Sequence, residues 1–473
     1  MKKFVLIFFF LIVTSEATAI NGSIEYNKDQ EILNVWGTNY EMGFAQGYLL
    51  NKRIVDFLSE FCFRIIDLPS FEYEFLHLNY KNYFTIPQKY KREAEGILDG
   101  IVAAGEDLYI DELHRDMDVV DILLGNSTFD INYIFLGQES FGCSSLSAWG
   151  KPTLNDTLIK GKIILGRNLD LTHQISEVEQ GLIMTYQPDS GKSWVGFGFP
   201  GIISTISGVN EDMLILAINA GYHTNTPNRA PRMVPLQFVL REILEVSDYN
   251  QDDIVNFRDP YEKILEVNNA GAWLLHTVIP YIDSSTISAA VLECVNESGD
   301  TFRTPENDEN LYPWYLLALN HEEVNYEPIY DSRYNTVLDS LQIYSDMTFN
   351  RIRNIIKAVA CENTLHTMFF LPNDSLFAIS FADSLHNASY FTPVWYKWSD
   401  LFPNHQPLEK LLANEKNLLF FPDLQRLVYT EGISIFSITG TRIDIADINK
   451  LPSGFFIVKV HNSGKSYKLL IIK

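Results

Sequence analysis

Cys143 directly follows a glycine in the segment Phe141-Gly142-Cys143-Ser144-Ser145, and the run Gly166-Arg167-Asn168-Leu169-Asp170 comes shortly after it. A thiol with a pKa of about 8.5 is mostly protonated at neutral pH, whereas an α-amine has a pKa of about 7.7–8. If the Gly142–Cys143 bond is cut, the new α-amine can act as general base for its own thiol. The ten histidines do not cluster, so no separate histidine base is evident. The pattern indicates a cysteine nucleophile that self-cleavage releases.

Several short segments stand in a characteristic order across residues 30–385. They are Trp36-Gly37-Thr38-Asn39-Tyr40-Glu41-Met42-Gly43-Phe44-Ala45-Gln46-Gly47, Gly142-Cys143-Ser144-Ser145 with Ala148-Trp149-Gly150, Gly166-Arg167-Asn168-Leu169-Asp170, Ser207-Gly208-Val209-Asn210-Glu211, Ala217-Ile218-Asn219-Ala220-Gly221, Leu319-Asn320-His321 and Ser332-Arg333-Tyr334. This set resembles the C45 family of acyltransferases and hydrolases (relatives of isopenicillin N acyltransferase) and, more distantly, the choloylglycine hydrolases. Both belong to the N-terminal nucleophile (Ntn) hydrolase superfamily.

The resemblance implies an α+β protein with a four-layer αββα fold that cleaves itself between Gly142 and Cys143. Cys143 would be the nucleophile and, through its amine, the base. Arg167 would lie near the sulfur, where a cation favours the thiolate. Asp170 would orient the α-ammonium. Taken alone, Arg167 and Asp170 are equally compatible with a surface ion pair.

Three further residues receive roles from the same resemblance. Asn219 would supply oxyanion-hole donors from its side-chain amide. Asn320 would contact the α-amine or the tetrahedral intermediate, and Arg333 would complete the charge network. Each also has a structural explanation, because asparagine is common in turns and an arginine at a helix start commonly faces water.

Nothing in the sequence indicates a cofactor or a metal ion. Residues 196–201 match the glycine pattern of a dinucleotide-binding loop, but Pro200 and β-branched residues follow where a helix should begin. His321-Glu322-Glu323 lacks a second histidine at helical spacing, so it is no zinc-protease motif. The net charge of -24 argues against nucleic acid as a partner. The expected partner is a small-molecule amide or acyl substrate.

The two ends of the chain predict export. Residues 1–19 read as a signal peptide, with Lys2 and Lys3 before an apolar run and Ala17-Thr18-Ala19 as the cleavage site. Residues 417–473 read as short strands and turns, and Leu451-Pro452-Ser453-Gly454 with the basic tail resembles the C-terminal sorting domain of the type IX secretion system. We expect a secreted or cell-surface protein that engages this machinery. The four cysteines are too few for a disulfide scaffold.

Between these ends the sequence predicts a helical α-chain over 20–142, a β-chain over 143–400 and a linker over 401–416. The two chains should stay associated after cleavage. Hydrophobic periodicity predicts these elements: helices over 39–67, 87–104, 111–124, 235–246 and 331–359; strands over 163–165, 182–186, 194–199, 213–218, 272–279 and 288–295; and a hairpin over 367–381. Residues 417–473 should form a small β-sandwich-like domain.

The sequence therefore predicts a secreted amidohydrolase or acyltransferase that acts on linear, non-peptide amides through a thioester. Aromatic residues are candidates for an acyl pocket, and the candidates are Trp149, Trp194, Phe197, Phe199 and Tyr222. Two alternatives stay open. One is a surface binding protein without catalysis on the same fold. The other is a papain-like protease, in which His276 would be essential.

Overall fold

The chain divides into two compact units, residues 1–403 and 404–473. The structure, a computed structural model, describes residues 20–28, 30–65, 68–131, 134, 141–171, 181–221, 231–268, 270, 273–282, 287–294, 301–307, 311, 313–320 and 332–402, and five strands of the second unit. The predicted signal peptide (1–19) and most of the predicted linker (401–416) lie outside the described residues.

A nine-stranded sheet forms one inner layer of the first unit, in the order β1-β2-β7-β8-β9-β10-β11-β12-β13. Its strands are β1 (Gly22–Asn27), β2 (Gln30–Gly37), β7 (Leu182–Pro188), β8 (Trp194–Gly198), β9 (Ser207–Asn210), β10 (Ile215–Ala220), β11 (Trp273–Val278), β12 (Ala289–Cys294) and β13 (Thr301–Arg303). Only the β2–β7 pair among these neighbours is parallel. Strands from before Cys143 (β1 and β2) and from after it (β7–β13) thus share one sheet.

A six-stranded antiparallel sheet forms the other inner layer, in the order β14-β5-β6-β15-β16-β17. Its strands are β14 (Tyr315–Ala318), β5 (Phe141–Ala148), β6 (Ile164–Leu171), β15 (Thr364–Leu371), β16 (Leu376–Phe381) and β17 (Val394–Lys397). β5 carries Cys143 and lies in the interior of this sheet, between β14 and β6. Cys143 pairs with Leu169 of β6, whereas the pairing with β14 begins only at Ser145, which leaves the other edge of the backbone at Cys143 open to side chains.

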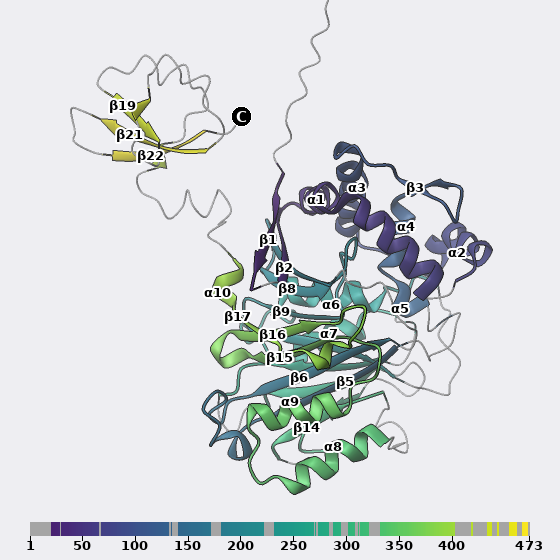
Figure 1. Cartoon of the computed structure of the whole chain (residues 1–473), viewed down its shortest axis with the longest axis vertical. Coiled ribbons are helices and arrows are strands. Elements are labelled where there is room, and N and C mark those ends of the chain that lie inside the picture. Colours follow the sequence, from purple (N-terminus) through teal and green to yellow (C-terminus); the bar gives the residue numbers. More distant parts are fainter. Residues whose placement is uncertain are drawn as a thin grey trace, which may run out of the picture. The chain divides into compact units, whose positions relative to one another are not determined.

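Three apolar clusters separate the layers. One lies between the two sheets and contains Val195 and Ala217 from the nine-stranded sheet with Met368 and Phe370 from the six-stranded sheet. A second cluster joins the nine-stranded sheet to the helices α1 (Asn39–Glu60), α3 (Gln88–Ala103), α4 (Val119–Gly125) and α6 (Leu236–Val246). The third joins the six-stranded sheet to α8 (Ser332–Ile343) and α9 (Phe349–Ala358). The described residues thus form a mixed α+β unit with helices outside two facing sheets (Figure 1).

Helices α1 and α3 pack unusually closely because each presents a pair of glycines four residues apart. A Cβ at Gly47 would lie 2.0 Å from the carbonyl oxygen of Ile97, and one at Gly96 would lie 2.2 Å from that of Tyr40. Gly43 and Gly100 make the same kind of contact. The glycine-rich segment near residue 40 therefore serves helix packing in this structure. The helix begins at a capping box in which Thr38 and Glu41 bond each other's backbone N–H.

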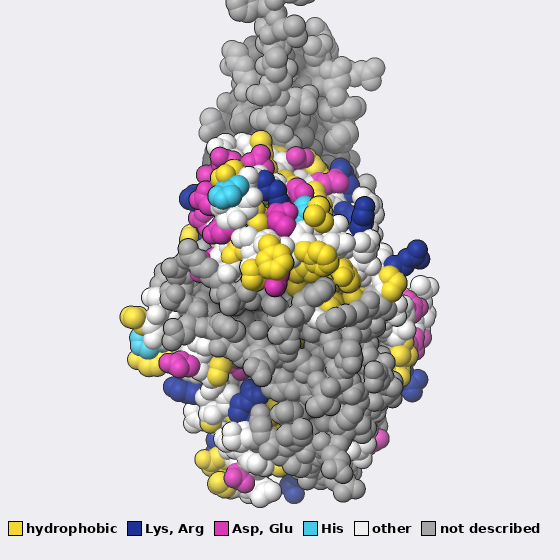
Figure 2. All heavy atoms as spheres, turned by 90° about the vertical axis from the view of Figure 1, so that its right-hand side faces the viewer, with side chains coloured by type: hydrophobic (Ala, Val, Ile, Leu, Met, Phe, Trp, Pro, Cys, Tyr) yellow, Lys and Arg dark blue, Asp and Glu magenta, His cyan; other side chains and the backbone are white. Residues whose placement is uncertain are grey.

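The remaining described helices are short or peripheral. They are α2 (Ser70–Tyr83), α5 (Thr128–Ile131), α7 (Arg258–Leu265) and α10 (Trp398–Leu401). None of the described helices has the length and apolar character needed to cross a membrane. Figure 2 shows one face of the molecule, on whose upper part acidic side chains are interspersed with basic ones.

Three of the differences between the structure and the predicted elements concern where helices begin. Two strands, β1 and β2, precede the first predicted helix. The helix predicted over 111–124 begins only at Val119, because Asp118 caps it and because β3 (Tyr109–Ile110) and β4 (Arg115–Asp116) form a small hairpin before it. The helix predicted over 331–359 is two helices, since Thr348 caps a new start by accepting from the N–H of Arg351.

The second unit contains one described sheet of five strands, in the order β18-β22-β21-β19-β20. Its strands are β18 (Leu418–Leu419), β19 (Ile433–Ser437), β20 (Arg442–Ile443), β21 (Gly454–Val460) and β22 (Ser466–Ile471). The predicted β character of residues 417–473 agrees with these strands, whereas the predicted sandwich-like arrangement and sorting role stay predictions.

Candidate active site

Strands β5 and β6 bring the first two predicted site residues together. Cys143 lies opposite Leu169, and Ser145 lies opposite Arg167. Residues two apart in a strand point to the same face, so Cys143, Ser145 and Arg167 share one face of the sheet. Met368, which lies opposite Arg167 on β15, belongs to the cluster between the sheets. The thiol therefore points toward the nine-stranded sheet near the start of β5, where Cys143 and Leu169 belong to the cluster that also contains α1, α3, α4 and α6.

Arg167 holds its guanidinium against the thiol. Its Nη2 lies 3.7 Å from Cys143 Sγ, while Nη1 donates to Ile218 O at 2.7 Å and to Asn219 Oδ1 at 3.1 Å. Both side chains are fully buried. Burial raises the pKa of the Cys143 thiol, whereas Arg167 and the backbone N–H groups of Asp170 and Ala220 act to lower it. A cation at this distance is worth about 4 kcal/mol to the thiolate at an effective dielectric constant of about 20.

The backbone nitrogen of Cys143 lies in a polar cluster of its own. It donates to Asn320 Oδ1 at 3.2 Å, and the same oxygen accepts from Arg333 Nη2 at 2.7 Å. Asn320 Nδ2 donates to Ala220 O at 2.6 Å, which fixes the orientation of the amide. Asn320 thus contacts the nitrogen that would become the α-amine after cleavage, and Arg333 contacts the same oxygen of Asn320.

Asp170 lies beside Gly142, the other residue of the Gly142–Cys143 peptide bond. It is the cross-strand partner of Gly142, and its Oδ2 lies 3.7 Å from the position of a Cβ on Gly142. Asp170 Oδ1 accepts from Thr364 Oγ1 at 2.6 Å, and Arg333 Nη1 lies 3.8 Å from Oδ2. No described residue gives Oδ2 a hydrogen bond. Burial raises the pKa of Asp170 to about 6, against the lowering effects of Thr364, Arg333 and Arg167.

Asn219 is brought to the site, but both hydrogens of its amide are already used. Nδ2 donates to Ala318 O at 2.7 Å and to Ser145 Oγ at 3.2 Å, while Oδ1 accepts from Arg167. In this arrangement Asn219 orients Arg167. A role in the oxyanion hole stays a prediction, and it requires one of these N–H groups to be released. The backbone N–H of Ala220, which already faces the sulfur, is an alternative donor.

His276 does not contact the thiol. Its Nδ1 is 2.9 Å from Ser145 Oγ and its Nε2 is 2.7 Å from Ser147 Oγ, so both ring nitrogens are occupied. Burial and the nearby arginines Arg303 and Arg167 lower its pKa to about 3, which leaves the ring neutral. A papain-like protease needs its histidine bonded to the cysteine. This geometry argues against the papain-like alternative.

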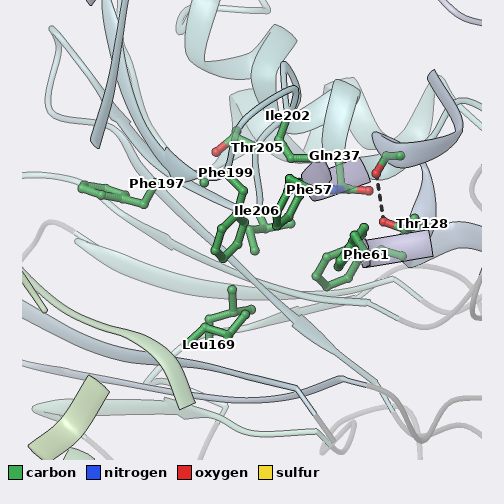
Figure 3. Close-up of a pocket in the computed structure, with 14 residues that line it drawn as sticks. Phe57, Phe61, Thr128, Leu169, Phe197, Phe199, Ile202, Thr205, Ile206 and Gln237 are labelled. Atoms are coloured by element: carbon green, nitrogen blue, oxygen red, sulfur yellow. Dashed lines mark hydrogen bonds between the residues drawn. The ribbon is translucent and has the colours of Figure 1, made fainter. Parts of the chain in front are cut away.

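An apolar pocket adjoins the site through Leu169, the cross-strand neighbour of Cys143 (Figure 3). It has about 450 Å³ of space including its open mouth, but its interior cavity volume is only about 30 Å³. The pocket is therefore a narrow slot. Its lining residues include Phe57, Phe61, Phe129, Phe197, Phe199, Ile202, Ile206 and Leu365. Of the predicted aromatic candidates, Phe197 and Phe199 line it, and Tyr222 lies outside the described residues.

Sequence reasoning missed three of the contacts that hold the site. Thr364 was not singled out, although it donates to Asp170, and no short motif marks it. Ser145 and Ser147 carry a detectable signal, because the alternation from Cys143 through Ser145 to Ser147 places three polar side chains on one face of a strand. The alternation indicates a site only once the register with β6 is known and β10 and β11 approach from the facing sheet.

Comparisons with known proteins give limited similarities. No family model matches the sequence. An uncharacterized protein of Archaeoglobus fulgidus is 23% identical over 197 residues, which is 38% of this chain and 31% of that protein, so the match spans less than a third of the relative's length. Among solved structures, the Caenorhabditis elegans ortholog of N-acylethanolamine-hydrolyzing acid amidase is 15% identical, with a TM-score of 0.38 over 49% of this chain and 93% of that one.

Two further structures are similar at the same level. Penicillin V acylase from Agrobacterium tumefaciens is 11% identical, with a TM-score of 0.35 over 55% of this chain and 88% of that one. Conjugated bile acid hydrolase from Clostridium perfringens is 14% identical, with a TM-score of 0.30 over 54% of this chain and 97% of that one.

Proposed function

We propose that the protein is an Ntn-type cysteine amidohydrolase that activates itself by cleavage between Gly142 and Cys143. One observation carries the proposal: the sulfur and the nitrogen of the same residue are held by two separate polar groups. Arg167 lies against the sulfur, and Asn320 accepts from the nitrogen. A buried structural cysteine needs neither contact. The four-layer αββα arrangement is the one that the resemblance implies.

Self-cleavage would begin with attack of the Cys143 sulfur on the carbonyl carbon of Gly142. The C–S bond forms, the C–N bond breaks, and the nitrogen takes up a proton to become the α-amine. Water then hydrolyses the thioester, which leaves a carboxylate on Gly142 and returns the thiol. Arg167 favours the attacking thiolate, and the unfilled Oδ2 of Asp170 is positioned to accept a hydrogen bond from the new amine.

Substrate turnover would repeat this chemistry on an external amide. The neutral α-amine takes the thiol proton, the sulfur attacks the acyl carbon, and the protonated amine donates to the leaving nitrogen. Water resolves the acyl-thioester and releases the acid. Hydrolysis is the preferred outcome outside a cell, where activated acyl donors are scarce, although an amine acceptor would make the same enzyme an acyltransferase.

The narrow apolar slot beside Leu169 is the proposed site for the acyl group. Its walls are aromatic and aliphatic, which suits an acyl chain or a single ring without charge. A fused-ring acyl group would require several phenylalanine side chains to move. We therefore infer a substrate with a slender apolar acyl group joined to its amine by a linear amide bond.

Intact-mass analysis of the purified protein beside Cys143→Ala tests the self-cleavage. We expect the wild type to split between Gly142 and Cys143 and the variant to stay whole. Cys294→Ala is the matched control, because Cys294 is another fully buried cysteine, on β12, and this variant should cleave normally. An uncleaved wild type would overturn the proposal and would favour a binding protein without catalysis.

Export is a separate proposal that rests on the two chain ends. Cell fractionation of the full chain and of a chain lacking residues 417–473 tests it in a host with type IX secretion. We expect the full chain in the medium or on the surface, with mature protein starting near Ile20, and the truncated chain retained inside the cell envelope. Equal distribution of the two chains would refute the sorting role.

A further inference from the structure

The buried face of β5 carries two serines beyond the nucleophile, and both contact one histidine. Ser145 and Ser147 are fully buried, as is His276, which approaches from β11 in the facing sheet. Ser145 Oγ also accepts from Asn219 Nδ2, and Asn219 Oδ1 accepts from Arg167. A continuous chain of hydrogen bonds therefore runs from the guanidinium beside the thiol through the interior to Ser147.

The shortest contacts give this chain one consistent direction. Arg167 is only a donor and Ala318 O is only an acceptor, so Asn219 must turn Oδ1 to the former and Nδ2 to the latter. Nδ2 therefore donates to Ser145 Oγ. The hydroxyl hydrogen of Ser145 has two acceptors within reach, His276 Nδ1 at 2.9 Å and Ala318 O at 3.5 Å, and the shorter contact favours His276. Neutral His276 then carries its proton on Nε2 and donates it to Ser147. All the donors point away from the positive charge, an arrangement in which hydrogen bonds strengthen one another.

We propose that Ser145, His276 and Ser147 are positioning residues that hold Asn219, and through it the Arg167 guanidinium, against the sulfur of Cys143. They do not touch the reacting atoms. Ile218 O holds the same guanidinium nitrogen from one side, and the relay through Asn219 holds it from the other. Loss of the relay would let the guanidinium shift, and a shift away from Sγ would weaken the thiolate. The inference deepens the proposed function and rests on Cys143 as its nucleophile.

Ser145→Ala and Ser144→Ala form a matched pair that tests the relay. Ser144 is the next residue on β5, is equally buried and accepts from Asn168 Nδ2 at 3.1 Å, but it lies on the opposite face and outside the relay. The readout is the ultraviolet absorbance of the Cys143 thiolate against pH, recorded as the difference from the same protein carrying Cys143→Ala. Among the described residues, the charged groups that act on this thiol are Arg167 and Asp170.

We expect Ser145→Ala to raise the pKa of the Cys143 thiol by about half a unit or more, which lowers the thiolate fraction about threefold at a pH below that pKa. Ser144→Ala should leave the titration unchanged while lowering the melting temperature comparably. Ser147→Ala should shift the titration in the same direction by less, because it removes the far end of the relay. Should Ser145→Ala unfold the chain, Ser147→Ala carries the test.

If the thiol of Ser145→Ala titrates at the same pH as that of Ser144→Ala, the relay is wrong. If Ser145→Ala does not fold, a thiol titration of Ser147→Ala identical to that of the wild type would overturn the relay instead. The titration needs only the thiol and no cleavage or substrate. A chain that does not split at Cys143 would therefore refute the proposed function while leaving this result interpretable.

Discussion

Thr364 gives a sharp test of how Asp170 is kept ionised. Its hydroxyl donates to Asp170 Oδ1 at 2.6 Å, inside a site where burial raises the pKa of that carboxyl to about 6. Thr364→Val keeps the shape of the side chain and removes the donor. A hydrogen bond to a charged group contributes about 1.5–3 kcal/mol. At 1.36 kcal/mol per unit, its loss should raise the pKa of Asp170 by about 1–2 units, to about 7–8.

The consequence for activity follows from the role proposed for Asp170. An ionised carboxylate accepts a hydrogen bond from the α-amine and orients it, whereas a protonated one does not. The rate of amide hydrolysis by the cleaved protein should therefore fall as the pH drops through about 6 in the wild type. In Thr364→Val the same decline should occur at about pH 7–8. The assay measures hydrolysis of an amide with a slender apolar acyl group at a series of pH values, by protein whose cleavage has been verified by intact mass.

Thr367→Val is the control for this experiment. Thr367 lies on the same strand, is also buried, and donates to Asn168 Oδ1 at 2.8 Å, a neutral acceptor. Thr367→Val should lose about as much stability as Thr364→Val and should keep the pH profile of wild-type activity. If the two variants decline at the same pH, the Thr364 bond does not set the ionisation of Asp170. If cleavage is absent, the infrared carboxyl band that Asp170→Asn removes gives the same titration directly.

Three further results are expected. Asp170→Asn should lose activity and should stabilise the fold at pH 8 by up to about 3 kcal/mol, because a carboxyl whose pKa is raised from 3.8 to about 6 on folding destabilises the folded state once it is ionised. This gain in stability should vanish below about pH 4 in thermal melts. A gain that does not change with pH would contradict the argument from burial. Gly47→Ala should lower the free energy of unfolding by more than about 2 kcal/mol, because the new Cβ would collide with Ile97 O. An unchanged midpoint in denaturant unfolding would refute the close packing of α1 on α3. Arg303→Met should lower the free energy of unfolding by about 3–5 kcal/mol because it breaks a buried ion pair in which Arg303 Nε lies 2.9 Å from Glu293 Oε1; a loss below about 1 kcal/mol would contradict this reasoning.

The sequence by itself determined the candidate nucleophile and the alternation of secondary structure. Gly142-Cys143 and the Arg167-x-x-Asp170 run were readable because each is a short contiguous segment, and the order of such segments carries the family resemblance. The hairpin over 367–381 was readable because its turn residues are local signals. The strand texture after residue 143 also agrees with the two sheets.

The tertiary structure decided which of these residues meet and what each can do. Asn219, Asn320 and Arg333 lie 76 to 190 positions beyond Cys143 in the sequence, and sheet pairing, not spacing, brings them to it. The sequence suggested a donor role for the Asn219 amide, but strands from both sheets surround that amide and occupy its hydrogens. Thr364 and His276 gain their contacts only when β15 and β11 take their places beside β6 and β10. Which strands pair over long sequence distances depends on how the faces of whole sheets and helices pack together, and a local sequence pattern does not contain that information.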